Sequence, residues 1–187
     1  KDIDGTEIGN LIAEMEDLTP SEQARIDKGE AVARSIKKLR LETKENAAKI
    51  FDLKGNAHKI KGRVKVGLNS INADSALDVT VGNELDLDVD SQFEKMAKKN
   101  KLKLLNRGGV IKVDKTNLKN GQEVESANIE FKVEPEWLGE QSVNNVKILR
   151  YDEGYTEVLA TRLAGVDEEG MLIFEGESPK GLSTFAV

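Results

Sequence analysis

The sequence contains no cysteine, which excludes disulfide bonds and zinc sites with cysteine ligands. Histidine occurs once, at His58, in a segment that reads as a polar loop between strands. A Ser-His-Asp triad would have to use this residue, and a zinc site with three histidine ligands is impossible. Because the chain also lacks a phosphate-binding loop motif, we predict that the protein is not an enzyme.

Aromatic residues are scarce, with one Trp and two Tyr in the whole chain. The core must therefore consist mainly of aliphatic side chains. Two interpretations of Trp137 stay open, an exposed platform for a ligand or a residue that covers the core at a sheet edge. Acidic residues are abundant enough for a glycosidase-type carboxylate pair, so that enzyme class is kept as an alternative.

Positive charge is in the minority, and the formal net charge is −6. Nucleic-acid binding needs a positive footprint, so we expect no nucleic-acid partner. The basic run at residues 98–103 is interpreted as a solvated surface. No apolar run approaches the roughly 20 residues that cross a bilayer. Because the chain begins at Lys1, we interpret it as a piece of a longer protein, with any membrane contact made by a segment outside it.

Three aspartates, Asp86, Asp88 and Asp90, alternate with apolar residues in a predicted strand at 85–89. Carboxylates that share one strand face repel each other, and a hard cation such as Ca²⁺ would relieve that repulsion. The spacing is not that of an EF-hand, because the glycine and glutamate of that loop are missing. We consider these residues as candidate Ca²⁺ ligands, and solvated surface charges as the alternative.

Residues 1–35 are predicted to form a short helical N-terminal segment. The apolar residues of its first part share a helical face: Ile8, Leu11, Ile12 and Met15. A second helix is predicted from Thr19, which with Glu22 matches a capping box, while Pro20 suits the first helical position. Neither helix is apolar enough to be stable alone, so we expect both to pack on another element.

From Ile36 onward the apolar residues recur with a period of two, which is typical of half-buried antiparallel strands. A short helix is expected at 91–99, with Ser91 as its cap. Glycine, asparagine and aspartate turns separate the runs. The fold class is therefore predicted as mainly β, with an antiparallel β-sandwich-like domain over 36–187. The clearest alternating runs are 64–68, 77–81 and 127–133, and a strand is expected at 183–187.

The stretch from about 126 to 187 resembles the PGF-pre-PGF module, which precedes the sorting tail of archaeal cell-surface proteins. Five pieces match in order: 127–133, the tryptophan site at 136–138, the arginine-tyrosine strand at 147–151, 158–161 followed by Gly165, and the ending at 177–187. Tyr155, Ala160 and Leu182 depart from the pattern, because the family more often has tryptophan, proline and an aromatic residue there.

The resemblance implies a structural or interaction module of an archaeal cell-envelope protein, exposed outside the membrane. Its expected partners are other surface subunits or further copies of itself. An adhesin or carbohydrate-binding module is the alternative, with Trp137 and Tyr151 or Tyr155 as the aromatic platform. No asparagine lies in a glycosylation sequon, so N-glycosylation of this chain is not expected.

Overall fold

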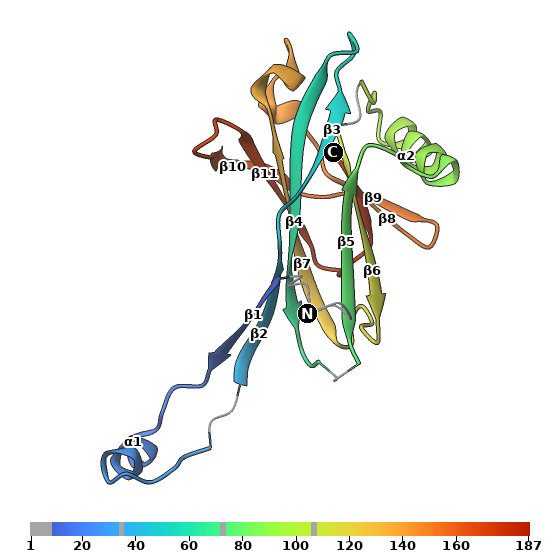
Figure 1. The fold of residues 1–187 in the computed structure, drawn as a ribbon. Coiled ribbons are helices and arrows are strands. Elements are labelled where there is room, and N and C mark those ends of the chain that lie inside the picture. The colour runs from blue at the N-terminus through green and yellow to red at the C-terminus, as the bar shows by residue number, and fades with distance from the viewer. Residues whose placement is uncertain (1–8, 34–35, 72–73, 106–107) are drawn as a thin grey trace.

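The computed structural model describes residues 9–33, 36–71, 74–105 and 108–187. The chain is mainly β, and two antiparallel sheets pack face to face as a sandwich (Figure 1). This confirms the predicted fold class. No helix in the described part of the chain is both long and apolar enough to span a membrane.

The larger sheet has seven strands in the order β1-β2-β4-β7-β11-β10, and β3 also pairs with β4. The pairs β3–β4 and β10–β11 are hairpins, and every strand pairing is antiparallel. The strands are β1 (Gly9–Met15), β2 (Ile36–Thr43), β3 (Asn46–Phe51), β4 (Ala57–Leu68), β7 (Val124–Val133), β10 (Thr161–Val166) and β11 (Leu172–Ser178).

The smaller sheet has five strands in the order β5-β6-β12-β8-β9. The helix α2 (Leu87–Lys99) covers part of its outer side, where Phe93 meets Tyr151 edge to face at 6.4 Å between ring centroids. Two short 3₁₀ helices, η1 (Pro135–Leu138) and η2 (Val143–Asn145), follow β7. The strands are β5 (Ala76–Gly82), β6 (Val110–Thr116), β8 (Leu149–Asp152), β9 (Tyr155–Val158) and β12 (Thr184–Ala186).

The core lies between the sheets, as the period-two pattern requires. On β4, Ile60, Val64 and Val66 point inward and are fully buried, and they belong to one cluster with Ile111 and Phe185 of the smaller sheet. Alternate positions on the same strand are basic. The predicted alternation at 64–68, 77–81 and 127–133 is therefore confirmed by strands β4, β5 and β7.

The outer face of β4 and β7 carries a network of charges, which we call the ion-pair ladder. Its middle is a two-bond pair in which the Arg63 guanidinium donates to both carboxylate oxygens of Glu130, each at 2.8 Å. Three lysines, Lys61, Lys65 and Lys132, are each shared between two carboxylates. The ladder consists of Glu45, Lys59, Lys61, Arg63, Lys65, Glu130, Lys132, Arg162, Asp167, Glu169 and Glu175.

The ladder makes stability depend on acid pH. The Met171 amide donates to Asp167 and lowers the pKa of that carboxyl from 3.8, and the hydrogen bond from Lys61 lowers the pKa of Glu169 from 4.5. A depressed folded pKa gives stability that is present above the ordinary pKa and is lost as pH falls through the folded value. We expect the melting temperature to fall progressively below about pH 4.5, as measured by circular dichroism.

The matched control for this acid dependence is Glu169→Gln, which removes one titrating carboxylate without changing its size. This variant should melt lower than the wild type at neutral pH, and its melting temperature should fall less steeply in acid. Parallel pH profiles for the two proteins would contradict the assignment.

The N-terminal region is a strand followed by a helix, so the helix predicted over Ile8 to Met15 is wrong. Residues 9–15 form β1, which pairs with β2, and a side chain at Gly9 would collide with the Glu42 carbonyl. Leu11 and Met15 suit a period of two as well as a helical period, so the short pattern was ambiguous.

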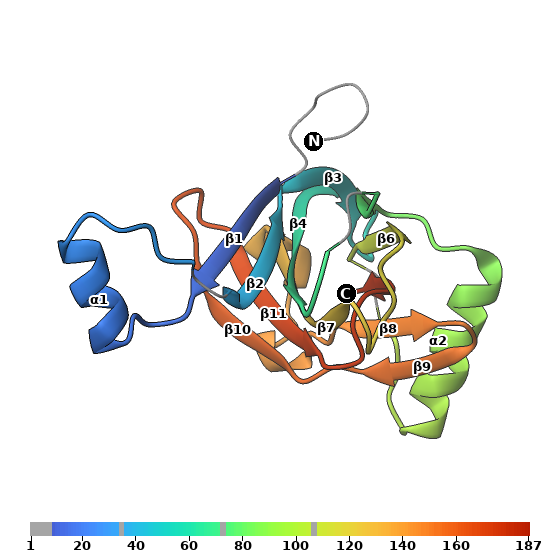
Figure 2. The ribbon, with the colours of Figure 1, turned by 90° about the horizontal axis from the view of Figure 1, so that it is seen from below.

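The second predicted helix is confirmed as α1 (Pro20–Asp27). The Thr19 hydroxyl accepts from the Glu22 amide, and the Glu22 carboxylate accepts from the Thr19 amide, which completes the capping box. However, α1 has no buried residue and lies beyond the end of the β1–β2 pair, away from the region where the two sheets pack (Figure 1 and Figure 2). We call residues 9–33, which contain β1 and α1, the arm. The expected packing of the arm's helix is absent within the described residues.

The strand predicted over 85–89 is also wrong, because α2 begins at Leu87 with Asp86 as its N-cap. The helix continues over the predicted 91–99, so Ser91 lies inside it instead of capping it. Val89, Phe93 and Met96 lie three or four residues apart and are buried on one face. The burial of residues at helical spacing explains why this segment is a helix although residues 85–89 alternate between apolar and acidic.

Candidate binding pocket

A pocket of about 810 Å³ is lined by segments at the end of the sandwich opposite α1, whose positions can be followed in Figure 1. Segments that are far apart in the sequence form it, and its volume lies within the roughly 300–1,000 Å³ of typical ligand sites. The segments that line the pocket are the β3–β4 turn at 52–56 with His58, α2 at 93–97, the segment 102–105, the region of η1 and η2 at 136–149, and residues 186–187.

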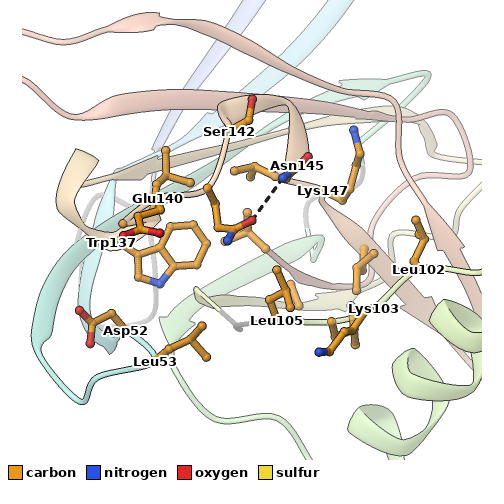
Figure 3. Close-up of a pocket in the computed structure, with 18 of the residues that line it drawn as sticks. Asp52, Leu53, Leu102, Lys103, Leu105, Trp137, Glu140, Ser142, Asn145 and Lys147 are labelled. Atoms are coloured by element: carbon orange, nitrogen blue, oxygen red, sulfur yellow. Dashed lines mark hydrogen bonds between the residues drawn. The ribbon is translucent and has the colours of Figure 1, made fainter.

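The walls of the pocket are largely apolar. Phe93 and Met96 of α2 are buried beneath it, and three leucines at its sides are exposed to solvent. The exposed fractions are 69% for Leu53, 42% for Leu102 and 41% for Leu105. Figure 3 shows Leu53 and Leu105 near the indole of Trp137. Removing such side chains from water is favourable by about 25 cal/mol per Å², so an apolar occupant would be stabilised.

Trp137 covers the core and also lines the pocket, which favours the second of its two interpretations. Pro135 begins η1, and this short helix places the Trp137 indole ring against Gly108. A Cβ atom added to Gly108 would lie 2.5 Å from that ring. The side chain is 8% exposed, and its indole nitrogen is buried without a hydrogen-bond partner in the described structure. The nitrogen edge is turned toward Asp52 and Leu53 (Figure 3). This N–H is a donor that lacks an acceptor.

His58 is buried in β4, so its prediction as an exposed loop residue is wrong. Its Nε2 atom lies 3.3 Å from Asp52, and its Nδ1 atom lies 3.6 Å from Glu134. Asp52 also accepts from the amides of Lys54 and Asn56 in the β3–β4 turn. Hydrogen bonds from Asn56 hold the pKa of Asp52 well below its usual range. Since each ring nitrogen faces a carboxylate, His58 fixes the turn at the side of the pocket.

An exposed strip of lysines borders the pocket, as the interpretation of a solvated basic run requires. We call it the lysine strip, and it runs from α2 into the following segment, where Lys103 lines the pocket beside Leu102. No carboxylate occurs between residues 95 and 105. The strip consists of Lys95, Lys98, Lys99, Lys101 and Lys103.

The three aspartates considered for Ca²⁺ do not share a strand face, because they lie at the start of α2. Asp86 is 74% exposed at its side chain and pairs with Lys112 at 3.3 Å. Asp88 and Asp90 are two helical positions apart and point to different sides of α2. Carboxylates are favourable at a helix N-terminus, which accounts for them. No group of three or more potential ligands that could hold a metal occurs among the described residues.

The two tyrosines considered for a sugar platform are engaged with neighbouring side chains. Tyr151 is half-buried beneath Phe93. Tyr155 is 51% exposed, but the Lys180 ammonium lies over its ring, 4.0 Å from the centroid. With Trp137 buried, these three residues do not form one exposed aromatic surface.

The pocket itself was not predicted from the sequence. The available signal was the run at 101–105, in which three leucines stand beside two lysines outside any amphipathic period. A scan against protein-family models and searches of curated proteins and of solved structures found no match.

Proposed function

We propose that this chain is a non-catalytic interaction module of an archaeal cell-envelope protein, which holds surface subunits together through its arm. The archaeal setting comes from the resemblance over residues 126–187. Sandwich architectures are common among cell-surface domains, which agrees with that setting without identifying a function by itself.

The arm is the observation that carries the proposal. Its helix is eight residues long, which is too short to be stable alone, and it contributes no residue to the core. Three apolar side chains are exposed along the arm, Leu11 at 53%, Ile12 at 45% and Ile26 at 39%. An element that buries nothing in its own domain yet presents apolar residues is suited to contact with another subunit.

The chemistry around the pocket supports binding more than turnover. The pocket combines apolar walls with lysines and carboxylates at its mouth, and the ring nitrogens of His58 are directed at carboxylates. Apolar surface with charges around it is the composition of a protein contact site, in which the centre is dry and the rim is polar.

The test is retention in the cell envelope. In cells that carry the gene, the double variant Leu11→Ser/Ile26→Ser should be lost from the washed envelope fraction, whereas the tagged wild type stays there. Both side chains are exposed, so the fold should persist, which circular dichroism checks. The matched control is Val166→Ser, an exposed apolar residue on β10. Full retention of the double variant, or wild type found in the cytosol, would reject the proposal.

A further inference from the structure

We infer that the pocket of one copy of this chain receives the arm of a second copy, so that subunits join head to tail. The inference rests on the proposed function and names the partner and the receiving site. Three features of the described residues carry it: the positions of the two surfaces, their charges, and the unpaired donor in the pocket.

The arm's helix α1 and the segments that line the pocket lie at opposite ends of the molecule (Figure 1). The twelve-residue strand β4 runs between them and spans roughly 40 Å. A single chain therefore cannot place its own arm in its own pocket. Two different surfaces that fit each other across copies give a heterologous contact, which continues from subunit to subunit.

The charges of the two surfaces are opposite. The arm carries six carboxylates and two cations, whereas the lysine strip beside the pocket carries five cations. All five lysines of the strip are exposed. The three carboxylates that line the pocket, Asp52, Glu136 and Glu140, are matched in number by the lining lysines Lys54, Lys103 and Lys147, so the receiving surface as a whole is positive. Opposite charges of this kind direct the approach of two proteins and favour one orientation. Like charges would repel if two arms or two lysine strips met. The arm-to-pocket contact is therefore favoured over an arm-to-arm or a strip-to-strip contact.

The apolar and polar groups also match. Ile26 at the outer end of the arm is the apolar side chain best placed to enter, and Leu53, Leu102 and Leu105 are the exposed groups that it would meet. The buried indole N–H of Trp137 has no acceptor. Because this nitrogen is closed to solvent, it pairs with a carbonyl or carboxylate oxygen of the arm only after the side chains around it move aside. The pairing then relieves a cost of about 1–3 kcal/mol for an unpaired buried donor.

The inference is tested by cross-linking, because the chain has no cysteine of its own. One preparation carries Ile26→Cys and a second carries Leu53→Cys, and the two are mixed under mild oxidation. A disulfide-linked dimer of the two preparations is expected. The control replaces the second preparation by Val166→Cys, which lies on β10 outside the pocket and is similarly exposed. Equal yields with the two partners would overturn the inference.

Sedimentation velocity gives the second readout. Association of the wild type should weaken about tenfold or more with Ile26→Asp or Leu105→Asp, and should fall as salt rises because exposed charges are screened. A wild type that does not associate with itself overturns the inference. If the arm variant loses envelope retention while no arm-to-pocket cross-link forms, the arm binds another subunit, so the proposed function stands and the inference falls.

Discussion

Replacing Phe131 by alanine is expected to lower the free energy of unfolding by about 3–5 kcal/mol. Phe131 lies on β7, the strand between β4 and β11, and is fully buried opposite Phe174. Truncation would remove apolar contacts and leave a cavity between the two sheets, because the neighbouring strands cannot collapse into it. The measurement is chemical denaturation followed by circular dichroism.

The matched control is Phe51→Ala, since Phe51 lies on β3 of the same sheet and is 50% exposed. Its loss should change the free energy of unfolding by no more than about 0.5–1 kcal/mol. Similar losses for the two variants would contradict the placement of the core between the sheets.

Replacing Arg150 by alanine should cost about 3 kcal/mol, or roughly 6–12 °C in melting temperature. The guanidinium is buried in β8 and donates to Asp152 at 2.6 Å, to Glu157 at 3.3 Å and to the Lys180 carbonyl at 3.3 Å. Without it, two carboxylates remain close together with less compensation. The loss lies at the low end for a buried pair because both carboxylates are partly exposed.

The comparison for Arg150 is Arg162→Ala, which removes another arginine that pairs with a carboxylate. Arg162 is 72% exposed at its side chain and pairs with Glu175. An exposed pair contributes about 0–1 kcal/mol, so this variant should melt close to the wild type. A larger loss for Arg162→Ala than for Arg150→Ala would show that burial does not determine the contribution.

The parts of the fold that were predictable are those in which one local pattern decides the outcome. Strands β4 and β7 were predictable because alternation over 64–68 and 127–133 separates a buried face from a polar one. The start of α1 was predictable because Thr19 and Glu22 complete each other's hydrogen bonds within one turn. Each of these signals is contained in a short segment.

The secondary-structure predictions were wrong where a short apolar pattern fits both a strand and a helix. In these segments, packing against a residue or strand distant in the sequence decides which of the two forms. Residues 9–15 form a strand because β2 pairs with them, and 87–99 form a helix because Phe93 and Met96 pack on the smaller sheet. The burial of His58 depends on Asp52 and Glu134, which lie on different elements. The pocket depends in the same way on segments brought together only by the complete fold.

The ion-pair ladder has a consequence for how the sequence can change over time. Lys61 contacts both Glu45 and Glu169, and Lys132 contacts both Glu45 and Asp167, so loss of any one carboxylate leaves each lysine with another. A single substitution of a carboxylate on this sheet face therefore leaves each of these lysines with an ion-pair partner, so its cost in stability is limited. Because the ladder links strands that are remote in the sequence, successive substitutions can exchange its members one at a time while the sandwich beneath stays intact.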